Sequence, residues 1–358
     1  MLVDKEFWKN RRVLITGHTG FKGSWLLLWL KHLGAEVTGF SLEAPTTPSL
    51  FEATNIDKDF NHVIGDIRNL NSLFECINTL APELVIHMAA QSLVFDSYID
   101  PVSTYQSNVM GTINLFEAIR KTDSVKAVLN ITTDKCYENK EWIWGYKETD
   151  PLGGYDPYSS SKACSEIISE SYRQSFFSSK GVLMATARAG NVIGGGDWSD
   201  NRIIPDAIRS FSQGRPLIVR SPLSIRPWQH VLEPISGYLA ICQKLINGED
   251  QFASSWNFGP NYSDNREVSI LADLMVDNWG GDAKWELDKK EHYHEAQQLK
   301  LDCSKSNFYL KWSPKWALDV SVDKTISWYK AFYNGQDMNE FSLKQILEYQ
   351  EKCSRQGE

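Results

Sequence analysis

Hydrophobic residues gather in short runs along the first half of the chain, and longer mixed stretches separate these runs. The aliphatic and β-branched runs predict strands at residues 12–16, 36–42, 62–67, 84–90, 126–132 and 183–188. Longer periodic stretches between them predict helices at 24–33, 105–120 and 158–178. Strands that alternate with helices indicate an α/β fold with a Rossmann-type doubly wound parallel sheet.

This alternation weakens after residue 188, where Pro, Trp and Arg become frequent and residues 190–198 break the regular pattern. We expect residues 1–188 to form mainly the first domain. Residues 189–358 then form mainly a smaller ligand-binding lobe, with some return of the chain to the first domain. The irregular stretch 138–157 is too long for a simple connector, so we interpret it as a binding loop or lid, or else as a surface excursion.

A glycine-rich turn follows the first predicted strand and precedes a helix. Strand, glycine turn and helix in this order form a dinucleotide site, because the turn lets a pyrophosphate approach the backbone and the free N–H groups of the helix N-terminus. The turn residues that we predict to contact a dinucleotide are Gly17, Thr19, Gly20, Phe21, Lys22 and Gly23.

The choice between NAD and NADP depends on the end of the second strand. An acidic residue usually binds the NAD ribose there, but this strand ends with Phe40, Ser41 and Leu42, and the nearest acid is Glu43. Lys22 is the one nearby cation that could accept a 2′-phosphate. We expect NAD, bound more loosely than usual.

The ends of the third and fourth strands supply further predicted cofactor contacts. Asp66, followed by Ile67, is placed to accept a hydrogen bond from an adenine amino group. Small residues, Ala89 and Ala90, let the cofactor backbone pass closely, and they are followed by Gln91. Ligands of doubly wound sheets collect at the carboxyl ends of the strands, where all these residues fall.

Candidate catalytic residues follow the fifth strand and open the next helix. Tyr158 and Lys162 are four positions apart and share a helix face, so we expect the ammonium to lower the pKa of the phenol and make it a base. Such a pair alone fits an ordinary helix surface equally well. The polar cluster Thr133, Asp134 and Lys135 at the end of a predicted strand favours a catalytic role.

Composition narrows the classes of partner. The chain is 42% hydrophobic and 23% charged, as in soluble globular proteins. Its net charge of -8 opposes nucleic-acid binding, the polar start argues against a secretory signal, and no apolar run is long enough for a membrane. The six cysteines lack metal-site spacing, so we expect a cytoplasmic protein with reduced cysteines and no metal.

Between residues 188 and 230 arginines exceed aspartates by three, which suits a diphosphate-bearing substrate.

The order and spacing of these motifs resemble the extended short-chain dehydrogenase/reductase superfamily. The matching positions are Gly17, Gly20, Gly23, Asp66, Ile67, Ala89, Ala90, Asn108, Thr133, Tyr158 and Lys162. Residues 133–135 are similar to the signature of nucleotide-sugar 4,6-dehydratases. The peptides 138–146 and 150–154, together with Lys135 where most relatives have glutamate, resemble the CDP-glucose branch of that group. His18, Lys22 and Ser41 depart from the NAD pattern of the superfamily.

The resemblance implies conversion of CDP-glucose to CDP-4-keto-6-deoxyglucose and water, with NAD regenerated. Tyr158 would take the proton of the sugar 4-hydroxyl, and Thr133 would hydrogen-bond the same oxygen. Loss of water across C5 and C6 then needs an acid and a base. Asp134 and, in its neutral form, Lys135 are the available pair.

The resemblance also implies substrate contacts and an assembly. Asn191 and Arg226 match positions that hold the pyrophosphate in relatives, with Arg202 as a neighbour, and residues 292–295 lie where relatives close over the nucleotide. Relatives pair through the helices that hold Asn108 and Tyr158, so a homodimer is expected. The product would feed deoxysugar synthesis for bacterial surface polysaccharide such as lipopolysaccharide O-antigen.

Three other functions stay open. A nucleotide-sugar 4-epimerase would share the fold, NAD and Tyr158 but would not need Asp134 and Lys135. A non-catalytic sugar-nucleotide binding protein is expected to have lost Tyr158 or Lys162, and both are present. An NADP-dependent reductase has only Lys22 in its favour. The choice of cytosine over other bases depends on the resemblance alone.

Overall fold

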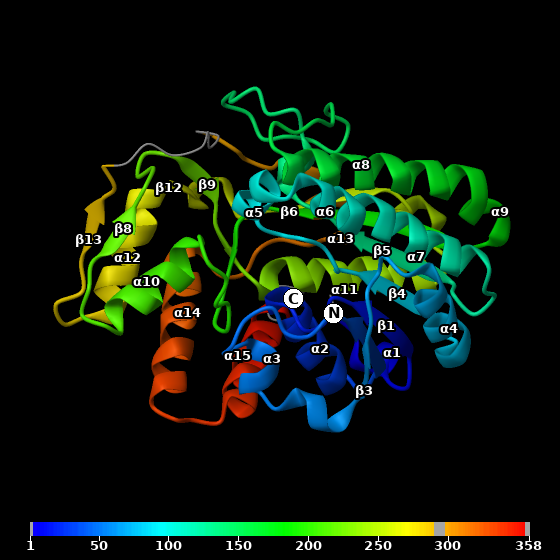
Figure 1. The fold of residues 1–358 in the computed structure, drawn as a ribbon, viewed down its shortest axis with the longest axis horizontal. Helices are drawn as coiled ribbons and strands as arrows, with labels where there is room; N and C mark the ends of the chain where they lie inside the picture. The colour runs from blue at the N-terminus through cyan, green and yellow to red at the C-terminus, as the bar shows by residue number, and fades with distance from the viewer. Residues whose placement is uncertain (1–2, 290–297, 355–358) are drawn as a thin grey trace.

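The first domain is built on a parallel sheet of seven strands in the order β11-β6-β5-β4-β1-β2-β3 (Figure 1). The computed structural model describes residues 3–289 and 298–354 of the 358. The strands are β1 (Arg12–Thr16), β2 (Glu36–Ser41), β3 (Asn61–Ile64), β4 (Leu84–His87), β5 (Ala127–Ile131), β6 (Leu183–Ala189) and β11 (Ser255–Phe258). The predicted Rossmann-type fold is confirmed.

Four strands end earlier than the sequence predicts, β2 and β5 by one residue and β3 and β4 by three. β3 ends at Ile64 instead of residue 67, and β4 ends at His87 instead of residue 90. Beyond β4 the chain leaves the sheet, and the N–H of Ala89 bonds to the side chain of Thr16. Asp66 and Ala89 therefore lie in loops beyond the carboxyl ends of their strands, where the backbone is free to face a ligand.

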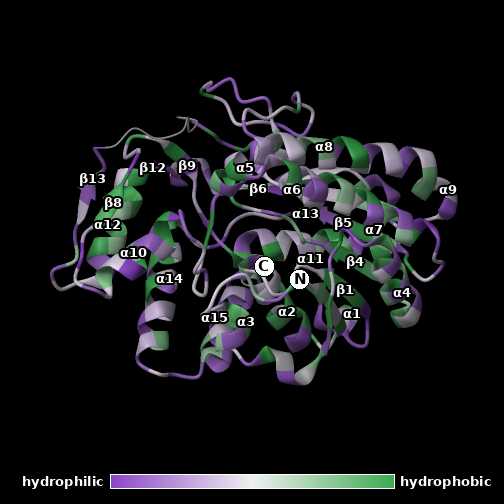
Figure 2. Cartoon of the chain, in the orientation of Figure 1, coloured by the Kyte–Doolittle hydropathy of each residue, from purple (hydrophilic) through white to green (hydrophobic). Residues whose placement is uncertain are grey.

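Helices cover both faces of the sheet, because each strand points alternate residues to opposite sides. Leu14 of β1 joins the core beneath α4 (Leu70–Leu80) and α7 (Gly111–Arg120). Ile15 joins the core on the other face, with α2 (Phe21–His32) and α11 (Leu232–Ile246). In Figure 2 hydrophobic colour gathers on the strands around β1, β4 and β5.

The helix α2 is apolar on nearly every side because it lies between the sheet and another helix. Its side chains Trp25 and Trp29 are fully buried. It packs on β1 and β2 and also against α15 (Met338–Ser354) at the end of the chain. The C-terminal helix thus returns to the first domain.

Both long helices predicted on the other face contain a π-helical turn. The first consists of α6 (Pro101–Tyr105), a π-helical turn at Gln106–Met110, and α7. The second consists of α8 (Pro157–Tyr172), a π-helical turn at Arg173–Phe177, and α9 (Ser178–Lys180). Asn108 lies within the first of these turns. Turns of this kind often mark functional sites.

The second lobe lies to the left of the sheet in Figure 1. Short strands there pair as β8 with β13 and β9 with β12, and α12 packs on α14. The remaining elements are α1 (Lys5–Trp8), α3 (Leu50–Ala53), α5 (Val94–Ile99), β7 (Val192–Ile193), α10 (Ile203–Phe211), β8 (Leu217–Val219), β9 (Ile225–Pro227), β10 (Gln229–His230), β12 (Asn265–Glu267), α12 (Val268–Trp279), β13 (Trp285–Leu287), α13 (Ser304–Leu310) and α14 (Leu318–Tyr333).

The stretch 138–157 forms the loop above α8 in Figure 1. Its residue Tyr146 forms a parallel bridge with Leu301, through hydrogen bonds from Tyr146 N to Lys300 O (3.0 Å) and from Asp302 N to Tyr146 O (2.9 Å). Several of its residues, including 138–141 and 154–156, line the large cavity described below. The loop is therefore part of a binding wall. In the part of the chain that the structure describes, no helix is both long and apolar enough for a membrane span.

Candidate active site

A cavity of about 1800 Å³ opens at the carboxyl ends of the strands and is lined by both lobes. Its volume is about twice that of a typical ligand pocket, so it has room for a dinucleotide and a nucleotide sugar together. The predicted site residues that line it are Gly17, Thr19, Gly20, Phe21, Lys22, Gly23, Asp66, Ile67, Ala89, Ala90, Gln91, Thr133, Asp134, Lys135, Tyr158, Lys162, Asn191, Arg202 and Arg226.

The glycine turn fits a dinucleotide. Gly17 has a φ of +76°, and a Cβ there would lie 2.6 Å from the backbone N of Ala89, so only glycine permits this close approach. At Gly20 a Cβ would meet Gly17 O at 3.4 Å, and the residue lines the cavity. Gly20 also caps α2 without a side-chain hydrogen bond. The N–H groups of the first helical turn are thus available to a diphosphate.

Thr19 and Lys22 extend from this turn in different directions. The hydroxyl of Thr19 bonds to Ser41 Oγ (2.8 Å) and to Leu42 O (3.0 Å), which fastens the turn to the end of β2. Lys22 Nζ donates to Tyr238 Oη at 3.4 Å. Burial, and then the positive charges of Arg202 and Lys162, lower the pKa of Lys22 to about 7. Lys22 therefore faces the catalytic groups, so the hypothesis of a 2′-phosphate contact loses its support.

Asp66 lines the cavity with its carboxylate held by Arg68. Arg68 donates from its backbone N to Oδ1 (2.8 Å) and from its guanidinium to Oδ2 (2.6 and 2.8 Å). These hydrogen bonds are the main reason that the pKa of Asp66 lies below its ordinary value. Each carboxylate oxygen has two lone pairs, so the predicted adenine contact stays compatible with this ion pair.

Asn108 lies behind the cavity wall and holds Gln91 and α8 in place by hydrogen bonds. Its amide accepts from Gln91 N (2.8 Å) and donates to Gln91 O (2.9 Å) and to Ser161 Oγ of α8 (2.9 Å). It is buried and joins the loop after β4 to the helix that carries Tyr158. Its part in a cofactor site is therefore to fix Gln91 and α8.

The catalytic turn, which we define as residues 133–136, follows β5 directly. Thr133 Oγ1 donates to Asp134 Oδ1 at 3.0 Å, and Lys135 Nζ lies 3.9 Å from the same oxygen. Asp134 is buried, and its Oδ2 has no hydrogen-bond partner among the described residues. A buried carboxylate oxygen needs a donor. Asp134 also lines the cavity, so its carboxyl group lies next to a ligand bound there.

Tyr158 and Lys162 lie side by side on α8, as predicted, but the pKa of the phenol differs from the prediction. Burial raises the pKa of Tyr158 to about 12, although a hydrogen bond with Thr133 and the charge of Arg202 oppose this rise. Lys162 Nζ donates to Ile131 O at 3.1 Å. Burial lowers the pKa of Lys162 to about 8. The expected lowering of the phenol pKa by Lys162 is thus not found: desolvation raises this pKa, and Thr133 and Arg202 are the groups that oppose the rise.

The three predicted substrate residues divide into two groups. Asn191 and Arg226 both line the cavity, and Asn191 has a buried Oδ1 with no partner in the described chain. Arg202 instead pairs with Asp197 (2.9 Å) and donates to Ser92 Oγ (3.3 Å). Its charge acts on Tyr158 and Lys22. Arg202 therefore belongs to the catalytic part of the cavity.

Residues 292–295, expected over the nucleotide, lie outside the described residues. Among residues 3–289 and 298–354 no group of three His, Cys, Asp or Glu side chains could hold a metal ion. Sequence reasoning did not identify Glu166 as a site residue. It also did not predict the buried ion pair that Glu166 forms with Arg188 (2.8 Å). The signal was an acid four positions after Lys162, on the same buried helix face.

Comparison with known proteins decides the family. The sequence profile of the NAD dependent epimerase/dehydratase family matches residues 13–257. The chain belongs to this family. It is 50% identical over 359 residues to the CDP-glucose 4,6-dehydratase of Salmonella typhimurium, covering 99% of this chain and 100% of that protein. It is 26% identical to a probable dTDP-glucose 4,6-dehydratase of Sinorhizobium fredii, covering 89% and 92% of the two chains.

Solved structures share the fold of this family member. The dTDP-glucose 4,6-dehydratase of Bacillus anthracis in complex with NAD matches with a TM-score of 0.74 at 20% identity, over 92% of this chain and 99% of that one. The UDP-glucose 4-epimerase of Thermotoga maritima matches with a TM-score of 0.77 at 20% identity, over 90% and 99%. The fold therefore accommodates both dehydratases and epimerases, and the choice between them depends on the site.

Proposed function

We propose that the protein is a CDP-glucose 4,6-dehydratase, a hydro-lyase that converts CDP-glucose to CDP-4-keto-6-deoxyglucose and water. The observation that carries the proposal is the catalytic turn. Asp134 and Lys135 line the same cavity as Tyr158, and Asp134 presents a buried carboxylate oxygen without a partner in the described chain. A 4-epimerase has no use for this acid and base. The relative of 50% identity supports CDP-glucose as the substrate.

Different residues of the cavity carry out different steps of the reaction. Tyr158 takes the proton of the sugar 4-hydroxyl while Thr133 holds the same oxygen by a hydrogen bond. The glycine turn, Asp66 and Ala89 would hold NAD, which would supply reversible hydride chemistry for the oxidation at C4 and the reduction at C6. The C4 ketone makes the C5 proton acidic, so Lys135 in its neutral form takes that proton, and Asp134 protonates the departing 6-hydroxyl. Asn191 and Arg226 hold the diphosphate, for which an arginine fork is well suited.

The test incubates the purified protein with CDP-glucose, with and without added NAD, and follows the nucleotide sugar by mass spectrometry. UDP-glucose and dTDP-glucose run in parallel. Loss of one water from CDP-glucose alone, with no net NADH, is the expected result. An unchanged mass with an inverted 4-hydroxyl would overturn the proposal in favour of an epimerase. Unchanged CDP-glucose would favour a binding protein.

We also propose a homodimer. Large apolar side chains are exposed on the helices near Asn108 and Tyr158: Ile99, Val102, Met110 and Ile167. Surfaces of this kind favour a protein contact. Light scattering after size-exclusion chromatography should give about twice the monomer mass of 40.8 kDa.

We place the enzyme in the cytoplasm, in keeping with its six free cysteines. Its product would enter deoxysugar synthesis for surface polysaccharide such as lipopolysaccharide O-antigen, because the 4-ketone is a site for further modification.

A further inference from the structure

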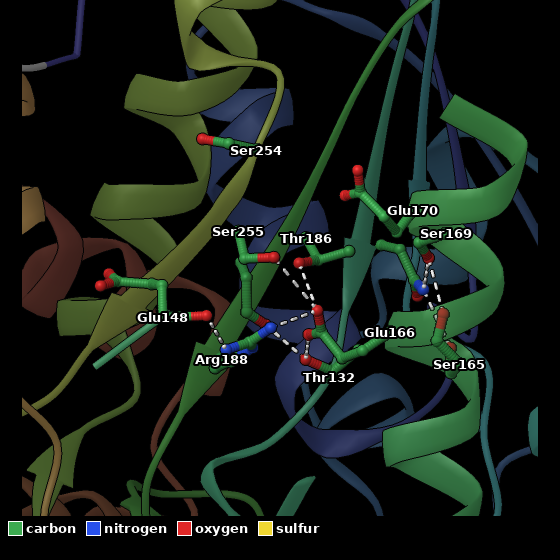
Figure 3. A network of polar contacts seen from close by, with 12 residues as sticks. Thr132, Glu148, Ser165, Glu166, Ser169, Glu170, Thr186, Arg188, Ser254 and Ser255 are labelled. Atoms are coloured by element: carbon green, nitrogen blue, oxygen red, sulfur yellow. Dashed lines mark hydrogen bonds and ion pairs between the residues drawn. The ribbon is translucent and has the colours of Figure 1, made fainter. Parts of the chain in front are cut away.

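A single buried carboxylate joins three strands of the sheet to the catalytic helix. Glu166 lies one turn beyond Lys162 on α8 and is 3% exposed. Its Oε1 accepts from the hydroxyl of Thr132, and its Oε2 accepts from Thr186 (2.7 Å) and Ser255 (3.3 Å). Figure 3 shows these donors converging on Glu166: Thr132 directly follows β5, Thr186 lies in β6 and Ser255 begins β11. Burial opposes ionisation, but Arg188 and the hydroxyl donors hold the pKa of Glu166 below its ordinary value.

Arg188 connects this carboxylate to the other side of the catalytic turn. Its Nη2 donates to Glu166 Oε2 at 2.8 Å, and its Nη1 donates to Tyr137 Oη (2.8 Å) and Glu148 O (3.2 Å). Its guanidinium also lies 4.9 Å from the centre of the Tyr137 ring. Thr132 directly precedes the catalytic turn and Tyr137 directly follows it. One ion pair thus fastens both ends of the turn.

Stability alone does not account for this pair. A buried ion pair is often no more stabilising than a well-packed apolar pair of the same volume, because both charges lose their hydration. What an apolar pair could not supply is the set of directional hydrogen bonds to Thr132 and Tyr137. It also could not supply a negative charge beside Lys162.

The surroundings of Lys162 make that negative charge important. The titratable groups that interact with its ammonium are Glu166 on α8, Cys136 in the catalytic turn, His87 of β4 and Lys22 of α2. Glu166 is the carboxylate among them. Burial lowers the pKa of Lys162 to about 8, and the Glu166 charge opposes this lowering.

We propose that the Glu166–Arg188 pair is a positioning device for catalysis, which holds the catalytic turn in place and supplies the anion beside Lys162. The expected change in kcat rests on the proposed dehydratase activity. The expected change in the titration of Lys162 can be measured without substrate, so the proposed function and the proposed role of the pair can fail separately. A parent protein that leaves CDP-glucose unchanged would refute the function, while the titration of Lys162 would still test the pair.

The experiment compares Glu166→Gln with Glu166→Asp, which retains the charge. Competitive acetylation of the unliganded protein, read by mass spectrometry of the peptide that contains Lys162, gives the pH at which this amine is half labelled. In Glu166→Gln we expect this midpoint to fall by about one unit or more, as expected when an opposite charge is removed. In Glu166→Asp it should stay at the parent value. We expect kcat of Glu166→Gln to fall about 10- to 100-fold, with KM for CDP-glucose within about threefold.

A control variant separates an effect on the position of the catalytic groups from an effect on the stability of the fold. Glu233→Gln alters another buried carboxylate, which accepts from Trp316 N (2.7 Å) and Tyr349 Oη (2.5 Å) far from the catalytic turn. It should lower the unfolding temperature without moving the Lys162 midpoint or kcat. A folded Glu166→Gln protein with an unchanged midpoint and unchanged kcat would overturn the proposal.

If Glu166→Gln does not fold, the double variant Glu166→Gln/Arg188→Met removes both charges and leaves none unpaired. It should lower the Lys162 midpoint, because the anion beside Lys162 is lost, and kcat should fall, because the hold on both ends of the catalytic turn is lost too. A folded double variant with parental kcat would refute the positioning role.

Discussion

Buried neutral histidines should make this protein lose stability in acid. His18, His87 and His230 are buried, and burial is the main reason that the pKa of each falls to about 3. His87 lies between the hydroxyls of Thr16 (2.7 Å) and Thr112 (3.1 Å). In the unfolded chain each imidazole would titrate near its ordinary pKa of about 6.5. Between pH 7 and pH 5 the unfolded state therefore gains protons that the folded state does not.

The sign and size of the effect follow from this difference. A histidine with a depressed folded pKa contributes no penalty above pH 6.5, and its penalty grows as the pH falls from about 6.5 toward 3. Between pH 7 and pH 5 each such histidine costs about 2 kcal/mol of unfolding free energy, and three cost about 6 kcal/mol. The result depends little on the folded pKa, because the folded histidines stay neutral throughout this range.

His230→Phe tests the reasoning at one site. His230 packs between Trp25 (ring centres 6.0 Å apart) and Trp316 (4.8 Å), its Nδ1 accepts from Leu232 N (3.3 Å), and its Nε2 has no partner in the described chain. A phenyl ring keeps the packing and loses the Leu232 hydrogen bond equally at both pH values. Guanidinium titrations at pH 7 and pH 5, followed by tryptophan fluorescence, should show about 2 kcal/mol less acid destabilisation in the variant than in the parent. His32→Gln, at a half-buried position, is the control and should change the difference less. An equal loss in parent and His230→Phe would refute the argument.

Three further predictions concern the active site. Tyr158→Phe should lower kcat about 10²- to 10⁴-fold while CDP-glucose still binds, as equilibrium dialysis would show; parental turnover would exclude Tyr158 as the base. Gly20→Ala should fold normally, because its Cβ would meet Gly17 O at an ordinary 3.4 Å, yet bind NAD at least about tenfold more weakly by calorimetry because the methyl group enters the diphosphate site; unchanged affinity would place the diphosphate elsewhere. Lys135→Met should still oxidise C4, seen as absorbance of enzyme-bound NADH in a single turnover, but lose about 10²- to 10⁴-fold in water elimination, followed by mass spectrometry; retained elimination would remove Lys135 as the C5 base.

The starts of the six predicted strands follow from the sequence to within one residue, whereas the ends of β3 and β4 do not. β1 begins and ends where its apolar run does, because both of its faces are buried against helices. The apolar run that starts at Leu84 continues past His87, but there the hydrogen bonds turn from the neighbouring strand to the side chain of Thr16. That partner is distant along the chain. The short strand β11 escaped prediction for the same reason, since its pairing with β6 is a long-range contact.

The sequence by itself determined the fold and the chemical groups of the site. Apolar periodicity, the glycine turn and the spacing of Tyr158 and Lys162 act through local geometry, which the chain carries wherever it folds. Only the tertiary structure decided how these groups are charged and held. Burial, not the neighbouring Lys162, dominates the pKa of Tyr158, and Arg202 faces the catalytic residues instead of joining Arg226. The Glu166–Arg188 pair joins residues 22 positions apart. Desolvation and long-range pairing depend on all the elements packed around a residue. A local sequence pattern therefore does not predict the pKa shifts and the ion pairs that result.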